Sequence, residues 1–269
     1  MPLAGSPRLV IGVSHKMYFS HARTVEWCSD VARIAAEHPA IVSGNVELFV
    51  IPTYLSVPAA IDLLGSLALV GAQDLSTEDT GAFTGEVSGA EIAELGCRVV
   101  EVGHAERRRM FGETDEIVGL KTAAALRNGL DPVLCVGEVE QGRAEEAVAE
   151  CIRQIESALA PSRRAGNGGR VLVAYEPHWA IGASEPASAG HIRTVCSALR
   201  DHLRTLPDFP ASAVIYGGSA GPGLLSEIAD GVDGLFLGRF AHDVESLTAI
   251  LDEAGDAASG QGHIDSLGT

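Results

Sequence analysis

The sequence predicts one α/β barrel in which eight parallel strands are surrounded by helices. Short β-branched runs alternate with longer amphipathic stretches along most of the chain, which is typical of a parallel sheet with helical connections. Eight repeats within 269 residues favour a closed (β/α)8 barrel, since such barrels commonly take this length as a single domain. An open doubly wound sheet is the structural alternative. The expected strands are Leu9–Val13, Glu47–Ile51, Ala68–Gly71, Arg98–Val102, Pro132–Val136, Val171–Tyr175, Ala213–Tyr216 and Gly234–Leu237.

Amphipathic helices are expected between these strands. Residues Thr24–Glu37 and Ala144–Leu159 each carry one apolar stripe, which we interpret as core packing. The segment Pro161–Gly169 is rich in Arg, Gly and Asn and is expected to be a loop before the sixth strand. We therefore assign residues 1–251 to the barrel. Residues 252–269, which are rich in Gly, Ser and Asp, are expected to form a flexible tail.

The composition restricts the possible partners. Hydrophobic residues make up 46% of the chain but aromatic residues only 5%, so Val, Leu, Ile and Ala must fill most of the core. The formal charge of −17, from 19 Lys and Arg against 36 Asp and Glu, argues against binding to nucleic acid or to an acidic membrane. An anionic substrate would therefore need a local cationic pocket.

The cysteine pattern and the hydropathy indicate a cytoplasmic protein. The five cysteines are an odd number without CxxC or His-paired spacing, which predicts free thiols and neither a disulfide framework nor a zinc site. No apolar run approaches the ~20 residues of a membrane span, and the first residues lack the pattern of an export signal. We expect no metal and no membrane association.

The strongest candidate for a catalytic residue is Glu176. It follows the strand-like run Val171–Tyr175, and Pro177 then ends that strand before a loop of small residues. A carboxylate at the C-terminal end of a barrel strand is placed where the active sites of such barrels lie. Glu176 is therefore a candidate base, and a solvated loop glutamate is the alternative.

Other strand ends carry residues that suit the same site. Lys16 follows the first strand, His104 the fourth, Gly217-Gly218-Ser219 the seventh and Gly238-Arg239 the eighth. The carboxyl ends of parallel strands meet at one end of a closed barrel, so these side chains are expected to converge. Any one of these residues alone would more often have a structural role. Their convergence at one end of the barrel is what favours a catalytic site.

These motifs, in this order, resemble those of the triosephosphate isomerase family. The resemblance runs from about Leu9 to about Leu251 and includes the blocks Gly81–Ser88, Phe111–Glu116 and Leu134–Glu138. It implies a TIM barrel that needs no cofactor.

The resemblance also implies catalytic roles, with Glu176 as the base, His104 as the electrophile and Lys16 as the cation of the pocket. The residue types suit the chemistry, because moving a proton between adjacent carbons needs a base, and the enediolate that forms needs donors at its oxygens. The neutral state of the histidine is taken from that family. Glu106 resembles the family's acidic partner of the pocket lysine.

The phosphate group is expected beside the glycine turns after the seventh and eighth strands. Backbone N–H groups at Ser219 and Gly238 could approach an anion closely, although a lone Gly-Gly pair would be explained equally well by a tight turn. The resemblance implies that the loop after Glu176 is a lid and that Gly182 supplies a further amide donor. Arg239 either contacts the phosphate or is a surface charge.

A homodimer is implied by a further part of the resemblance. Thr84 corresponds to the threonine at the tip of a long loop that enters the partner subunit's active site. Glu86 and Arg107 are expected to pair near that interface. An ordinary exposed loop is the alternative.

Several positions depart from the family's pattern. Ser14 stands where asparagine is usual, Ala105 where serine is common, and Asp74 where asparagine is common. Pro186 lies in the lid, and Arg239 replaces a second glycine. The change at Ser14 replaces an amide donor by a shorter hydroxyl, so it leaves the identity of the substrate open.

The sequence thus predicts an aldose–ketose isomerase that acts on a small phosphorylated sugar through a cis-enediolate. Its first candidate reaction interconverts glyceraldehyde 3-phosphate and dihydroxyacetone phosphate, the triose step of glycolysis and gluconeogenesis. The alternative is a tetrulose-phosphate isomerase that interconverts erythrulose 1-phosphate and erythrulose 4-phosphate in sugar-alcohol catabolism. A non-catalytic barrel that binds sugar phosphate is kept as a candidate of another class. The joint presence of Lys16, His104 and Glu176 argues against it.

Overall fold

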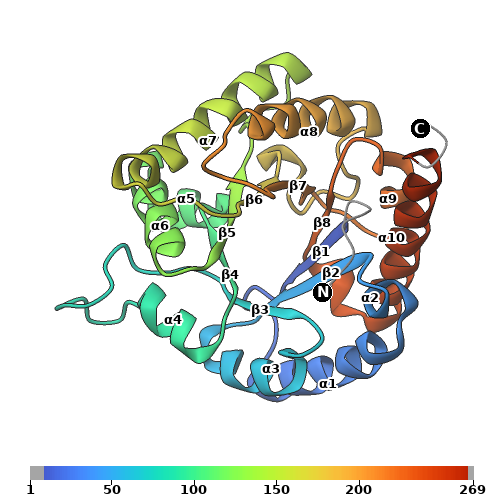
Figure 1. Cartoon of the computed structure of the whole chain (residues 1–269), viewed down its shortest axis with the longest axis horizontal. Coiled ribbons are helices and arrows are strands. Elements are labelled where there is room, and N and C mark those ends of the chain that lie inside the picture. The colour runs from blue at the N-terminus through green and yellow to red at the C-terminus, as the bar shows by residue number, and fades with distance from the viewer. Residues whose placement is uncertain (1–8, 266–269) are drawn as a thin grey trace.

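The computed structural model describes residues 9–265 and shows a closed barrel of eight parallel strands (Figure 1). Neighbouring strands in the sequence are neighbours in the barrel, and β8 closes the ring by pairing with β1. The predicted (β/α)8 barrel is therefore confirmed, and the open sheet is excluded. Each predicted strand agrees with the structure to within one residue at either end. The strands are β1 (Leu9–Ser14), β2 (Val46–Ile51), β3 (Leu69–Ala72), β4 (Val99–Val102), β5 (Asp131–Val136), β6 (Leu172–Tyr175), β7 (Ala213–Tyr216) and β8 (Gly234–Leu237).

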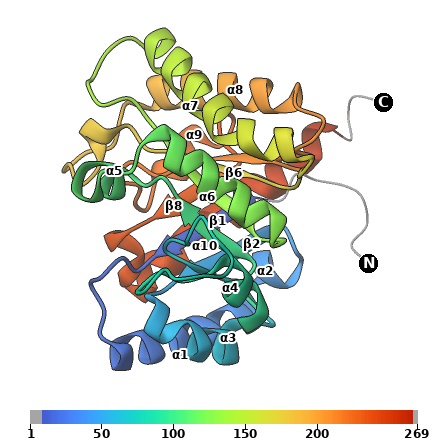
Figure 2. The ribbon, with the colours of Figure 1, turned by 90° about the vertical axis from the view of Figure 1, so that its left-hand side faces the viewer.

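Helices surround the strands, as Figures 1 and 2 show. The two helices expected from their apolar stripes lie within α1 and α7. The helices are α1 (His21–Glu37), α2 (Pro39–Val42), α3 (Val57–Leu64), α4 (Gly89–Leu95), α5 (Ala105–Phe111), α6 (Asp115–Arg127), α7 (Ala144–Ala165), α8 (Ala189–Arg204), α9 (Leu224–Ile228) and α10 (Val244–Asp265), with short 3₁₀ turns η1 (Tyr54–Ser56), η2 (His178–Ala180) and η3 (Arg239–His242).

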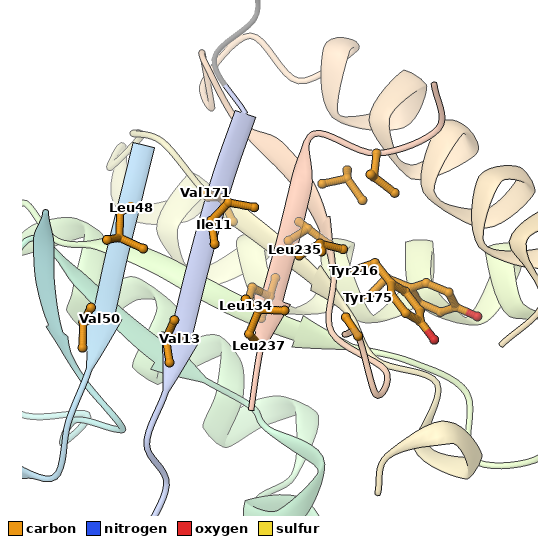
Figure 3. Close-up of a cluster of buried hydrophobic side chains, with 14 of the residues drawn as sticks. Ile11, Val13, Leu48, Val50, Leu134, Val171, Tyr175, Tyr216, Leu235 and Leu237 are labelled. Atoms are coloured by element: carbon orange, nitrogen blue, oxygen red, sulfur yellow. The ribbon is translucent and has the colours of Figure 1, made fainter. Parts of the chain in front are cut away.

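Two apolar layers hold the barrel together. Side chains that point outward from the strands pack against the helices, and Figure 3 shows part of this layer, including Ile11 and Val13 of β1. Side chains that point inward form a second cluster, in which the rings of Phe49 and Phe236 lie 5.6 Å apart. A Cβ atom at Gly12 would lie 1.9 Å from Cζ of Phe49, so only glycine leaves room for that ring. The barrel interior is therefore a packed core.

Helix α7 is longer than the sequence predicted. It continues through Pro161 and ends at Gly166, whose φ of 72° is the left-handed conformation that glycine favours at a helix C-terminus. The prediction of a loop over Pro161–Gly169 is therefore wrong for its first five residues. The proline ring packs against α6, where a Cβ atom at Gly119 would lie 3.1 Å from Cγ of Pro161. This packing helps to offset the hydrogen bond that proline removes from the helix.

The C-terminal segment also differs from the prediction. Residues 252–265, which the sequence placed in a flexible tail, continue helix α10, and residues 266–269 lie outside the described part of the chain. Ala254 and Ala258 are buried, and a Cβ atom at Gly255 would lie 3.0 Å from Cβ of Ala40 in α2. The small residues that suggested flexibility instead allow α10 to pack closely. No helix within residues 9–265 is long and apolar enough to cross a bilayer.

Candidate active site

A cavity of about 1340 Å³ opens at the C-terminal end of the strands. Its walls come from the segments that follow β1, β4, β6, β7 and β8. The sequence expected this convergence, and the structure brings together nine of the predicted site residues, which are Ser14, Lys16, His104, Glu106, Glu176, Gly182, Ser219, Gly238 and Arg239. Thr84, Glu86 and Arg107 are not part of this wall.

Glu176 and His104 face each other in the cavity. Oε2 of Glu176 lies 3.4 Å from Nε2 of His104, and both residues are about 4% exposed. The backbone N–H of Glu176 donates to the carbonyl of Val136 at 2.8 Å, which fixes the residue just beyond the end of β6. A Cβ atom at Gly217 would lie 2.7 Å from Cγ of Glu176, so the glycine after β7 makes room for the carboxylate.

His104 is oriented by the start of α5. Its Nδ1 accepts a hydrogen bond of 3.1 Å from the backbone N–H of Glu106, so the neutral ring carries its proton on Nε2. Burial and the nearby charge of Lys16 lower the pKa of His104 to about 3. The ring is therefore neutral at physiological pH, and its Nε2–H is a donor on the side of Glu176.

Lys16 provides the positive charge of the site. Its Nζ donates to Oε1 of Glu106 at 2.9 Å. Burial alone would lower the pKa of Lys16, but the carboxylates of Glu176, Glu106 and Glu101 together raise it, so the ammonium stays charged. The residue has a left-handed backbone with φ of 46°, and its carbonyl accepts a hydrogen bond of 2.8 Å from the side chain of Gln73. Gln73 thus helps to hold the strained turn that aims Lys16 into the cavity.

Sequence reasoning missed Glu101, a buried carboxylate of β4. The hydroxyl of Ser14 donates to its Oε2 at 3.1 Å, and its Oε1 lies 3.9 Å from Nε2 of His104. Burial raises the pKa of Glu101 to about 7, and burial together with the charge of Glu101 raises the pKa of Glu176 to about 8. A base that titrates near neutral pH can both take and return a proton, as an isomerase requires.

The loop after Glu176 lies against the turn after β7. The hydroxyl of Ser219 donates to the carbonyls of Ala180 and Ala183 at 2.8 and 3.2 Å, and the Tyr216 hydroxyl accepts a bond of 3.0 Å from the N–H of Ala187. The side chain of Ser219, which the sequence assigned to phosphate binding, is therefore engaged with this loop. Nη2 of Arg239 approaches the loop near Gly182, where a Cβ atom would lie 3.9 Å away.

A second carboxylate that the sequence did not single out fixes the base of the same loop. Glu138, which follows β5, accepts hydrogen bonds from the Tyr175 hydroxyl at 3.1 Å and from Nε1 of Trp179 at 2.8 Å. The Tyr175 hydroxyl also lies 3.0 Å from Nε2 of His191. These contacts tie the residues on both sides of Glu176 to the barrel. The sequence signal was present, since Glu138 ends the block Leu134–Glu138.

The residues predicted for an interface do not line the cavity. Thr84 and Glu86 are exposed in the long loop between β3 and α4, which extends away from the barrel in Figure 1. The expected pair of Glu86 with Arg107 is not formed within the described chain. Arg107 instead bonds Asp74 at 2.8 Å and Glu113 at 2.5 Å. Asp74 stands where the family commonly has asparagine, so it supplies a carboxylate that the prediction did not consider.

The geometry suits proton transfer next to a carbonyl group. A carboxylate base, a neutral imidazole donor and an ammonium line the same cavity, and they could remove a proton and stabilise the resulting oxyanions. Among the side chains that the structure describes, no group of three or more His, Cys, Asp or Glu residues is placed to hold a metal ion.

Comparisons with known proteins agree with this geometry. The family model described as triosephosphate isomerase matches residues 9–254. An L-erythrulose-1-phosphate isomerase of Pectobacterium atrosepticum is 51% identical over 250 residues, covering 93% of this chain and 96% of that protein. Another protein of that name, from Rhizobium etli, is 39% identical with 90% of each chain covered. A triosephosphate isomerase of Cutibacterium acnes is 38% identical, covering 83% of this chain and 89% of the relative.

Proposed function

Because this chain belongs to the triosephosphate isomerase family, we propose that it interconverts erythrulose 1-phosphate and erythrulose 4-phosphate. The chain is an isomerase of this sugar-phosphate family, and the choice of substrate is what the proposal adds. The relative at 51% identity carries the name of an erythrulose-phosphate isomerase, whereas the triosephosphate isomerase from Cutibacterium acnes is 38% identical. This reverses the order of the two substrates expected from the motifs alone.

The reaction moves one carbonyl group by one carbon. Erythrulose 1-phosphate has its carbonyl at C2 and a hydroxyl at C3. Removal of the C3 proton by Glu176 gives a cis-enediolate, and return of a proton to C2 leaves the carbonyl at C3. The phosphate is then on the fourth carbon of the new ketose. Both partners are ketoses, so the description as an aldose–ketose isomerase fits only the triose pair.

The observation that carries the mechanism is the contact of 3.4 Å between Glu176 and His104 in a cavity that Lys16 also lines. We assign the role of the base to Glu176. The Nε2–H of His104 and the ammonium of Lys16 then donate hydrogen bonds to the oxygens of the enediolate. A base and two donors within one cavity suit this reaction and exceed what a purely binding barrel requires.

We assign the phosphate to the part of the cavity that is lined by Gly182, Ser219, Gly238 and Arg239. Backbone N–H groups and one guanidinium gather there, and both favour an anion. The loop that carries Gly182 would shield the enediolate from water, because an exposed enediolate phosphate eliminates its phosphate group.

The substrate assignment predicts a clear kinetic preference. We expect kcat/KM for erythrulose 1-phosphate to exceed that for glyceraldehyde 3-phosphate by at least about 10-fold, the discrimination that one carbon group typically gives in a shaped pocket. The measurement compares initial rates of the purified enzyme with each substrate. A higher kcat/KM for glyceraldehyde 3-phosphate would overturn the four-carbon assignment and restore the triose reaction.

We also propose a homodimer. Large apolar side chains are exposed at the end of the barrel that carries the cavity, including Met17 at 90%, Leu55 at 87% and Phe83 at 48%. These residues come from the segments after β1, β2 and β3, which are neighbours in the barrel, and Phe83 lies in the same loop as Thr84. Exposed apolar groups gathered on one face are typical of an interaction surface.

Sedimentation can test the dimer directly. We expect a mass of about twice 27.9 kDa, and we expect Phe83→Asp to shift the equilibrium toward monomer because it places a charge in the interface. Val42→Asp is the matched control, since Val42 is also exposed but lies in α2, at the other end of the barrel. A monomeric parent protein would contradict the proposal.

We also propose a cytoplasmic location. The five cysteines are free thiols and all are buried, which suits a reducing compartment.

A further inference from the structure

The hydrogen-bonded pair of Ser14 and Glu101 has no contact with substrate in the mechanism described so far, in which Glu101 acts only on the pKa of Glu176. Val99 of β4 points into the barrel, whereas Val100 and Val102 pack against the outer helices. By alternation, Glu101 points inward, one step closer than Val99 to the cavity. It is about 4% exposed.

This position is costly for a carboxylate. An ionised group that is taken out of water costs free energy unless it is paired and hydrogen-bonded. Within the described residues, the one hydrogen bond to the Glu101 carboxylate comes from Ser14, and Glu101 raises the pKa of the neighbouring Glu176. An apolar residue would fill the same space at lower cost, as Val99 does one layer below. The arrangement therefore favours a functional role over a purely structural one.

The pair fixes the direction in which the Ser14 hydroxyl can form hydrogen bonds. The hydroxyl hydrogen of Ser14 is committed to Oε2 of Glu101, and the backbone N–H of Lys16 donates to the same hydroxyl oxygen at 3.4 Å. A hydroxyl oxygen has two acceptor sites, so one remains. Ser14 lines the cavity, and its hydroxyl thus presents an acceptor to a bound molecule. An asparagine side chain would be larger and could present its amide donors instead.

The pair also lies close to the reacting centre. Nε2 of His104 is 3.4 Å from the carboxylate of Glu176 and 3.9 Å from that of Glu101, so the two carboxylates flank one imidazole nitrogen. The carbon that loses its proton must lie beside Glu176. Erythrulose 1-phosphate differs from dihydroxyacetone phosphate by one hydroxymethyl group on that carbon. The extra group therefore has to fit next to the reacting centre, on the side away from the phosphate.

We propose that Ser14 and Glu101 form the specificity-determining subsite for this hydroxymethyl group. The terminal hydroxyl of the four-carbon substrate donates to Ser14, and Ser14 donates to Glu101. The small serine side chain leaves the space, and the carboxylate fixes the serine hydroxyl as an acceptor toward the substrate. This inference rests on the proposed four-carbon reaction, and it names the residues that select it.

Two variants test the subsite by comparing both substrates. Ser14→Ala removes the acceptor, and Glu101→Gln offers an amide donor that can reverse the hydrogen bond to Ser14. We expect each to lower the ratio of kcat/KM for erythrulose 1-phosphate to kcat/KM for glyceraldehyde 3-phosphate by about 10-fold. The ratio is the readout because Glu101 also raises the pKa of Glu176, so Glu101→Gln changes the base for both substrates alike. Assays at about pH 8 keep Glu101 mainly ionised.

Glu47→Gln is the matched control. Glu47 lies on the same face of β2 as Phe49 of the interior cluster, and its carboxylate forms an ion pair of 2.6 Å with Arg170 near the opposite end of the barrel. This variant removes a strand carboxylate far from the cavity, and the ratio of the two kcat/KM values should not change. If Glu101→Gln does not fold, Ser14→Ala alone tests the subsite, because the loss of one hydroxyl group is the smaller change to the protein.

The outcomes separate the two proposals. If the parent enzyme prefers glyceraldehyde 3-phosphate, the four-carbon function fails, and the subsite inference fails with it. If the parent prefers erythrulose 1-phosphate and both variants lower the two kcat/KM values equally, the function stands and the subsite inference is overturned. A selective loss of the four-carbon substrate supports both.

Discussion

Glu176→Gln is expected to lower kcat by about 10²–10⁴-fold, the contribution typical of a positioned general base. The amide keeps the shape of the side chain but cannot accept a proton. Glycerol phosphate should bind with nearly unchanged affinity, since the groups assigned to the phosphate lie elsewhere in the cavity. The measurements are steady-state kinetics and isothermal titration with glycerol phosphate.

The loss of activity should not come from unfolding. Burial and Glu101 raise the pKa of Glu176 to about 8 in the folded protein, above the ordinary value of 4.5. An acid whose folded pKa is raised favours the folded state at low pH, and that contribution is lost as the pH rises from about 4.5 through about 8. Near pH 8 the Gln variant should therefore unfold at the same temperature as the parent or a higher one. Unchanged turnover would rule out Glu176 as the base.

Lys16→Met is expected to lower kcat/KM by about 10²–10³-fold for either substrate, the effect typical of losing one donor to a developing oxyanion. Lys16 lies among the carboxylates of Glu101, Glu106 and Glu176, and the whole chain carries a formal charge of −17. Without the ammonium, an anionic substrate would meet uncompensated negative charge. Both a higher KM and a lower kcat should follow.

Arg109→Met is the matched control for this variant. Arg109 also lines the cavity, but it is exposed and its charge is screened by solvent, so kcat/KM should change by less than about 3-fold. An equal loss in both variants would mean that Lys16 acts only through the general potential of the cavity. Retention of activity in Lys16→Met would contradict its assignment to the enediolate oxygens.

The sequence was sufficient to predict the barrel and the convergence of Glu176, His104 and Lys16 at one end of it. Strand periodicity placed each side chain at a strand end, and closure of the barrel then brought the strand ends together. Glu101 was missed for the same reason. It lies inside an apolar strand, and Val99-Val100-Glu101-Val102 has no polar alternation to show which side chains face the interior.

Other differences arose because composition does not report packing. Pro161 and the small residues of α10 are typical of loops, but in the folded chain they allow close contact between helices. The partner of Arg107 depended on the three-dimensional position of Asp74. The shared motifs favoured the triose reaction, whereas our subsite proposal rests on the departure at Ser14 and on its hydrogen bond to Glu101, which only the structure shows.

The filled interior of the barrel restricts how substrate enters the active site and how product leaves it. The inward side chains, with Phe49 packed across Gly12, leave no passage along the barrel axis. Substrate must enter and product must leave through the same opening, past the loop that carries Gly182. Each product molecule therefore blocks the next substrate until it departs, so product inhibition should be purely competitive, and the rate of exchange at this single entrance sets an upper limit on turnover.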